Sequence, residues 1–402
     1  MPTNVLYVNS VPYTGGAEIS LLTLMAHLDR TRYCPHLVTK EQGMLSAQAV
    51  KYDIPVSMQS FPWFSRRRPW VYAESIWHLV RTIQENDIAL VHTNCDRSLR
   101  HTMWACWLAR IPYVSHARDC VRGWFQPENL AALNRAKRVI ANSKAVANAF
   151  VEAGVSDKLV EVIYNPVDVA RFSQAKPEAG IALRSSLGIP LDAFVVGLVG
   201  QIQPIKGHEG FIAAAAYVAR AVRDAKFLIV GADFGTVSQV FLQRLKQSVA
   251  ESDLSAHVCF TGFRDDIPAV MQALDVLVVP SWSEPSGCIV EEEDVVDIAA
   301  KRHSPRLLQV GFGRVVIEGM AAGRAVVATH LDGMLEVLEH KCNGLLVPPR
   351  DVRALADAMI LLAEDTELRN RLGEGGRRTA ERFAVIRHVA QVQALYDVVL
   401  GV

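Results

Sequence analysis

The chain has 402 residues, half of them apolar, and its 42 lysines and arginines balance its 42 aspartates and glutamates. This length exceeds what one ordinary core organises, so we expect two domains, and the zero formal net charge gives no indication of a nucleic-acid partner. Seven scattered cysteines, without a CxxC pair or metal-ligand spacing, indicate reduced thiols and a cytoplasmic protein.

The first half of the chain alternates short apolar runs with helical stretches. It opens on a strand-like run at residues 5–8 with no basic and apolar leader before it, so we expect no signal peptide. Similar runs lie at residues 36–38, 89–92, 113–115 and 139–141. Short apolar runs between helices are typical of strands buried on both faces, which predicts a parallel, doubly wound sheet.

The same alternation restarts at residues 194–200. Strand-like runs follow at residues 226–230, 258–261, 276–280 and 325–328, with helices at 209–222 and 240–251. We assign residues 1–172 to the first domain, the polar stretch 173–190 to a linker and residues 191–383 to the second domain, with a helix at 384–402 returning to the first. Two such domains face a central cleft at the carboxyl ends of their strands, where ligands bind.

Two loops that follow strands carry residues suited to a phosphate. Gly15 and Gly16 open the first helix, where backbone amides and the helix dipole favour an anion, although a tight turn explains them equally well. In the second domain Lys206 precedes the helix at 207–222. A cation is misplaced at a helix N-terminus unless an anion is bound there, so we favour diphosphate contact over a solvated lysine.

A motif near residue 300 is divided by 26 residues, 286–311. Without them, seven residues would separate Glu284 from Glu318, and both carboxylates could accept hydrogen bonds from sugar or ribose hydroxyls. An exposed loop acid and a helix-dipole acid are the ordinary alternatives. Glu292 offers a second register, but only Glu318 is followed by a small-residue run and the strand at 325–328. We expect residues 286–311 to form a compact excursion with a helix, since a loop whose ends meet costs little entropy.

Two further features lie in the first domain. His116 closes a strand and is expected to face the cleft, where its imidazole could donate to a sugar hydroxyl or be purely structural. Arg66, Arg67 and Arg68 lie among the aromatic residues of Pro62–Trp70. This loop could bind an anionic acceptor or touch a membrane surface, while a solvated loop with aromatic anchors is the more ordinary interpretation.

In this order, the motifs resemble those of the GT-B retaining glycosyltransferases of family 4, a large bacterial group that builds polysaccharides, lipopolysaccharides and glycolipids. The resemblance rests on Gly15-Gly16-Ala17-Glu18, Asn142-Ser143-Lys144-Ala145-Val146, Asn165-Pro166-Val167-Asp168, Lys206-Gly207-His208 and Glu318-Gly319-Met320-Ala321-Ala322-Gly323. It implies two Rossmann-like domains, sugar transfer with retention, and neither a metal nor a cofactor, because cationic side chains and helix dipoles carry the leaving-group charge.

The resemblance also implies roles for individual residues. Lys206 would neutralise the leaving diphosphate, Glu284 would hold the sugar's hydroxyls, and His116 would contact the sugar near the reaction centre. Glu318 would hold the ribose hydroxyls. The implied donor-binding residues are Gly15, Gly16, Gln201, Lys206, Phe263, Arg264, Glu284, Phe312, Gly313 and Glu318.

Gln201 departs from the family pattern, which has an arginine there as a second diphosphate ligand; glutamine brings no charge. The expected partners are a nucleotide-sugar donor and a glycan or lipid-linked acceptor, with peripheral contact on the inner face of the membrane. A nucleotide-sugar epimerase, which needs no acceptor, and a non-catalytic nucleotide-sugar-binding protein remain alternatives. The ordered motif set favours the transferase.

Overall fold

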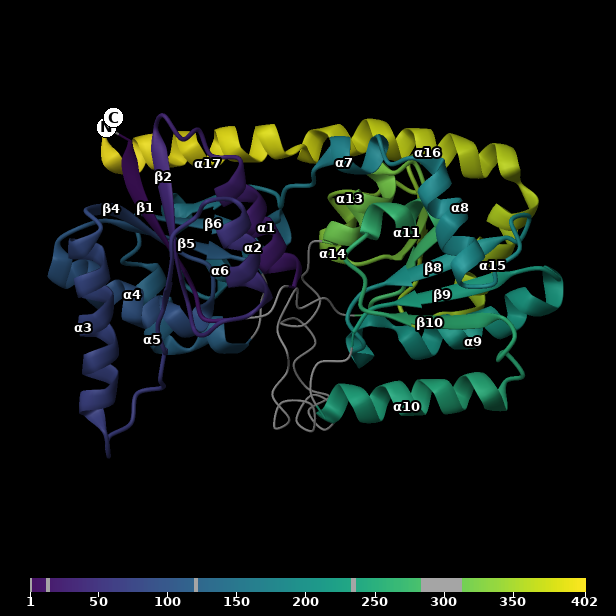
Figure 1. Ribbon diagram of the computed structural model, residues 1–402, viewed down its shortest axis with the longest axis horizontal. Coiled ribbons are helices and arrows are strands. Elements are labelled where there is room, and N and C mark those ends of the chain that lie inside the picture. The colour runs from purple at the N-terminus through teal and green to yellow at the C-terminus, as the bar shows by residue number, and fades with distance from the viewer. Residues whose placement is uncertain (1, 12–14, 119–121, 233–235, 283–312) are drawn as a thin grey trace.

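The computed structural model describes residues 2–402 except 12–14, 119–121, 233–235 and 283–312. Two parallel sheets, each covered by helices on both faces, lie side by side, and the C-terminal helices run across both of them (Figure 1). The structure thereby confirms the predicted α/β architecture of two doubly wound domains. The expected helix within residues 286–311 lies outside the described residues.

The first sheet has the order β3-β2-β1-β4-β5-β6-β7, and all neighbours are parallel. Its strands are β1 (Thr3–Asn9), β2 (Tyr33–Thr39), β3 (Val56–Met58), β4 (Ile88–Thr93), β5 (Tyr113–Ala117), β6 (Arg138–Ala141) and β7 (Val160–Val162). Its helices are α1 (Gly16–Ala26), α2 (Met44–Lys51), α3 (Pro69–Glu85), α4 (Asp96–Ala109), α5 (Pro127–Leu133) and α6 (Lys144–Glu152). The edge strands β3 and β7 were not predicted, because three residues are too few to show a pattern.

The second sheet has the order β10-β9-β8-β11-β12-β13, again with parallel neighbours. Its strands are β8 (Val195–Val199), β9 (Lys226–Val230), β10 (Val258–Gly262), β11 (Val276–Val279), β12 (Ala325–Thr329) and β13 (Leu345–Val347). The remaining helices are α7 (Val169–Ser173), α8 (Pro177–Ser186), α9 (His208–Ala221), α10 (Thr236–Glu251), α11 (Ile267–Ala273), α13 (Arg314–Ala321), α14 (Asp332–Leu335), α15 (Val352–Glu364), α16 (Thr366–Ala380) and α17 (Val385–Leu400). None of the described helices combines the length and apolar character needed to cross a bilayer.

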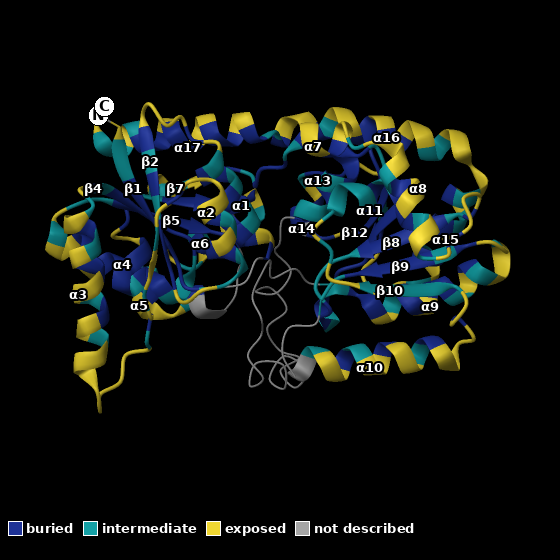
Figure 2. Cartoon of the chain, in the orientation of Figure 1, coloured by how far each residue is buried: buried dark blue, intermediate teal, exposed yellow. Residues whose placement is uncertain are grey.

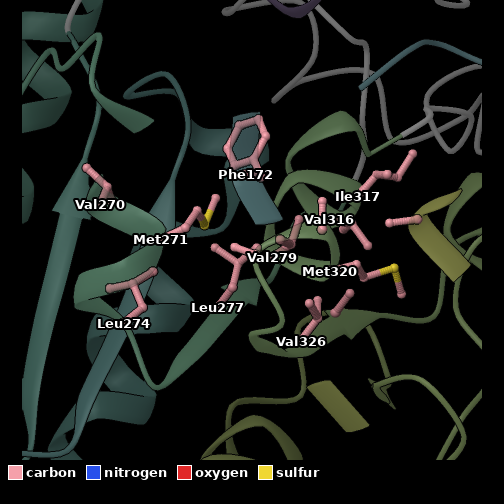
Figure 3. Close-up of a cluster of buried hydrophobic side chains, with 14 of the residues drawn as sticks. Phe172, Val270, Met271, Leu274, Leu277, Val279, Val316, Ile317, Met320 and Val326 are labelled. Carbon is pink, nitrogen blue, oxygen red and sulfur yellow. The ribbon is translucent and has the colours of Figure 1, made fainter. Parts of the chain in front are cut away.

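The expected linker at residues 173–190 is wrong. Residues Pro177–Ser186 form α8, which packs against α11, and Leu183 and Ile189 are buried in the second core. Phe172 also packs there against Met271 and Val316, so the chain enters the second domain before the expected boundary (Figure 3). The segment appeared to be a linker because polar residues are interspersed along α8, so its few apolar residues gave no clear pattern.

The chain crosses between the domains at two adjacent points. Val167 donates its backbone N–H to the carbonyl of Phe383 at 2.9 Å and forms a parallel bridge with Ala384. Beyond this crossing, α17 buries Val392 and Tyr396 against β1 and α1 of the first domain, as predicted for the returning helix. The outer side of α17 stays exposed (Figure 2).

Candidate functional site

The first-domain side of the cleft carries the glycine turn at the start of α1. The carboxylate of Glu18 accepts the backbone N–H of Gly15 at 2.9 Å, which fixes the turn, and burial raises the pKa of this carboxyl. A side chain at position 16 would meet open space. No described atom lies close to the backbone of Gly16 on that side, and neither glycine needs a positive φ.

His116 lies in a buried layer of rings between the first sheet and α17. Its ring is 5.3 Å from that of His92 and 6.2 Å from that of His388, and it has no exposed surface. Burial, reinforced by Arg118, lowers the pKa of His116 well below its usual range, so the ring is neutral. The expectation that it faces the cleft is wrong, because its position on β5 turns the side chain toward α17.

A buried arginine that the sequence analysis missed lies beside this layer. Arg118 donates its Nε–H to Asn94 at 2.6 Å and an Nη1–H to Asn165 at 2.5 Å. It thereby ties the end of β4 to the segment that crosses into the second domain. The Asn-Pro-Val-Asp motif contains Asn165 and was the sequence signal that could have indicated this contact.

In the second domain the loop after β8 carries Gln201 and Lys206. The amide nitrogen of Gln201 is buried and has no acceptor in the described part of the chain. The aliphatic part of Lys206 lies over Gly200. Gly207 has a φ of 76° and packs closely against the Pro280 carbonyl at the end of β11. This left-handed glycine holds Lys206 at the carboxyl edge of the sheet, just before α9, as the sequence predicts.

Glu318 is the fifth residue of α13, the helix whose N-terminus lies at the same edge. Its carboxylate is 3.1 Å from Nη2 of Arg314, and both side chains are about nine-tenths buried. Burial raises the pKa of Glu318, against the opposing effects of Arg314 and then Arg171. Gly313 directly precedes the helix, and a Cβ there would collide with Met334, so the side chain of Met334 packs closely against its backbone. Arg314 was absent from the expected donor site.

The other expected site residues divide into three groups. Phe263 is half-exposed, and the guanidinium of Arg264 is engaged by Asp266 at 2.8 and 2.6 Å. Glu284 and Phe312 lie outside the described residues. The three arginines Arg66, Arg67 and Arg68 lie on an exposed loop.

Two family models match the two halves of the chain. One, described as Glycosyltransferase Family 4, matches residues 14–171, and the other, described as Glycosyl transferases group 1, matches residues 193–365. The chain belongs to this glycosyltransferase family.

Individual proteins agree with this assignment. The chain is 29% identical to a D-inositol 3-phosphate glycosyltransferase of Salinispora arenicola, over 88% of this chain and 71% of that protein. It is 30% identical to a 2-deoxystreptamine glucosyltransferase of Streptomyces kanamyceticus, over 67% of this chain and 62% of that protein. The crystal structure of Anabaena HepE with UDP and glucose superposes with a TM-score of 0.82 and 28% identity, covering 98% of this chain and 99% of HepE.

In this glycosyltransferase the two domains also meet through one carboxylate. Glu336, directly after α14, accepts backbone N–H groups from Lys144 and Ala145 at the start of α6, both at 2.9 Å. It also accepts the hydroxyl of Tyr164 at 2.9 Å. Tyr164 in turn accepts, through its carbonyl, a hydrogen bond from His388 at 2.7 Å. These contacts join the second domain to the buried histidine layer, and no sequence motif indicated them.

Proposed function

We propose that this glycosyltransferase moves a sugar from a nucleoside-diphosphate donor to an acceptor hydroxyl with retention of configuration. The observation that carries the proposal is a set of donors without acceptors at one edge of the second sheet. Among the described residues, no acceptor reaches the buried amide nitrogen of Gln201, on the loop that carries Lys206, or the buried Nε and Nη1 of Arg314, which pairs with Glu318. Buried donors without acceptors are costly, and a phosphorylated ligand would supply the missing oxygens. The relative HepE, crystallised with UDP and glucose, supports this choice.

In the proposed reaction, the acceptor oxygen bonds to the anomeric carbon as the bond from that carbon to the diphosphate breaks. Attack comes from the face that the diphosphate leaves, and the acceptor's proton passes to the leaving diphosphate. Lys206 and the N-terminus of α13 stabilise the charge that develops on the diphosphate, with no metal or cofactor required. Glu318 holds the ribose and Glu284 the sugar.

A thermal-shift screen of UDP, GDP, ADP and CDP, each with its common sugars, tests the donor site. We expect one nucleoside diphosphate to raise the melting temperature, and turnover with an acceptor pool to yield a product with the donor's anomeric configuration, unaffected by EDTA. A screen without any shift would refute the donor site. Product from the donor alone would indicate an epimerase, and binding without turnover would indicate a binding protein.

We further propose that the acceptor is lipid-linked, in bacterial polysaccharide or glycolipid synthesis, and that the enzyme works on the inner face of an anionic membrane. Five of the seven tryptophans are exposed, although this residue usually buries most of its surface. They are Trp63, Trp70, Trp77, Trp104 and Trp107, on the adjacent helices α3 and α4 and on the loop before α3. Aromatic rings with interleaved arginines suit a lipid interface with negative headgroups.

Cosedimentation with phosphatidylcholine vesicles, with and without phosphatidylglycerol, tests the membrane contact. Replacing Trp70 and Trp77 by serine should reduce binding to both kinds of vesicle. Replacing Arg66, Arg67 and Arg68 should reduce binding only to the anionic vesicles. The matched control is Tyr217→Ser, another exposed aromatic, which lies on α9 of the second domain. A wild-type protein that leaves anionic vesicles unbound would refute this contact.

A further inference from the structure

Arg314 and Arg184 are buried to the same extent but differ in how their donors are satisfied. Each side chain is 11% exposed and forms an ion pair, Arg184 with Asp275 at 2.9 Å and Arg314 with Glu318 at 3.1 Å. The two arginines therefore provide a comparison within one domain.

The fold provides acceptors for Arg184 at all three nitrogens. Its Nε–H donates to the carbonyl of Ala273 at 2.9 Å, its Nη1 to the carbonyls of Leu191 and Ala193 at 3.0 and 2.9 Å, and its Nη2 to Asp275. Arg184 is a structural cation, because every nitrogen that it buries has an acceptor.

Arg314 has an acceptor at one nitrogen only. Its Nη2 faces Glu318, whereas Nε and Nη1 are buried and have no acceptor among the residues that the structure describes. A buried guanidinium with two unsatisfied nitrogens destabilises the fold, and a purely structural role does not explain it. The N–H groups of Nε and Nη1 lie on different edges of the planar guanidinium, so each can donate to a separate oxygen of a phosphorylated ligand.

The charge around Arg314 also favours an anion. Burial lowers the pKa of Arg314, Glu318 acts in the opposite direction, and Arg171 lowers it further. Two cations thus share the carboxylate of Glu318, which leaves local positive charge at the N-terminus of α13, an end of the helix dipole that is itself positive. A negatively charged ligand would reduce the repulsion among Arg314, Arg171 and the positive end of the helix dipole.

Arg314 begins α13 at the carboxyl edge of the second sheet, where the loop after the adjacent strand β8 carries Gln201. Gln201 also buries an amide nitrogen for which the described residues offer no acceptor, but it brings no charge. We propose that Arg314 binds the donor's diphosphate through Nε and Nη1 and supplies, together with Lys206, the positive charge that Gln201 lacks. This inference rests on the proposed nucleoside-diphosphate donor.

Calorimetric titration of the nucleoside diphosphate that binds best, compared with its parent nucleoside, tests the inference. Arg314→Gln should weaken diphosphate binding about 10- to 100-fold, the usual effect of losing a charge-assisted hydrogen bond, without a comparable change for the nucleoside. The control Arg184→Gln should lower the melting temperature and leave the diphosphate's Kd unchanged. Should Arg314→Gln fail to fold, Arg314→Lys keeps the charge beside Glu318 but loses the planar set of donors, and we expect an intermediate loss of diphosphate affinity.

The second arm restores the charge from the neighbouring loop. Adding Gln201→Arg to the Arg314→Gln protein should recover part of the lost affinity for the diphosphate and part of kcat. Equal diphosphate affinity in wild-type and Arg314 variants, or equal losses for nucleoside and diphosphate, would overturn the role of Arg314. A wild-type protein that binds no nucleoside diphosphate would instead refute the donor site as a whole.

Discussion

Replacing Glu336 by alanine should loosen the contact between the two domains. The carboxylate accepts three hydrogen bonds at 2.9 Å, from the amides of Lys144 and Ala145 and from the hydroxyl of Tyr164. A charge-assisted bond contributes about 1.5–3 kcal/mol when buried. Glu336 is half-buried, so we discount each bond to about 1 kcal/mol for solvent screening, or roughly 3 kcal/mol for the contact.

Hydrogen–deuterium exchange measures this contact at the two amides themselves. A loss of roughly 3 kcal/mol corresponds to exchange about 100-fold faster, so the amides of Lys144 and Ala145 should lose protection to that extent in Glu336→Ala. The matched control is Ser143→Ala, which removes the cap on Val146 within the first domain and should act mainly at that amide. Unchanged exchange at Lys144 and Ala145 in the Glu336 variant would refute the reasoning.

Three further predictions concern the core and the donor site. Burial lowers the pKa of His388 to about 3 from its usual 6.5. Below about pH 6.5 the imidazole of His388 is protonated in the unfolded chain but stays neutral in the folded protein. The free energy of unfolding therefore falls toward pH 3 by up to about 1.4 kcal/mol per pH unit. In His388→Gln the melting temperature should fall less steeply than in the wild type between pH 6.5 and 4. An identical slope in the two proteins would contradict this role of His388. Glu318→Ala should weaken nucleoside-diphosphate binding in calorimetry more than Glu292→Ala, whereas the reverse order would favour the other register of the divided motif. Gly207→Ala should lower the free energy of unfolding by roughly 2–4 kcal/mol in urea titrations, because its Cβ would collide with the Pro280 carbonyl at a left-handed backbone position; a loss below about 1 kcal/mol would contradict this.

The sequence predicted the fold well where local patterns carry the information. The central strands of both sheets are buried on both faces, so each appears as a short apolar run in the sequence. The positions of Lys206 and Gly207 were also predictable, because a strand, a glycine turn and a helix follow one another directly. Prediction failed for α8, whose polar outer face resembles a linker, and for three-residue edge strands such as β13.

Much of the candidate site depends on contacts that no local pattern encodes. In the sequence His116 is a histidine at the end of a strand. In the structure its ring is covered by α17, which comes from the far end of the chain. Glu336 caps a helix of the other domain, and that contact exists only once the domains have packed together.

By itself the sequence determined the two-domain α/β class and the order of the motifs, because hydrophobic spacing and turn residues act locally. The tertiary structure decided which polar groups lose water and which of them find a partner. Arg184 and Arg314 are both arginines in a helix of the second domain. Only packing leaves Arg314 with buried donors for which the described residues provide no acceptor.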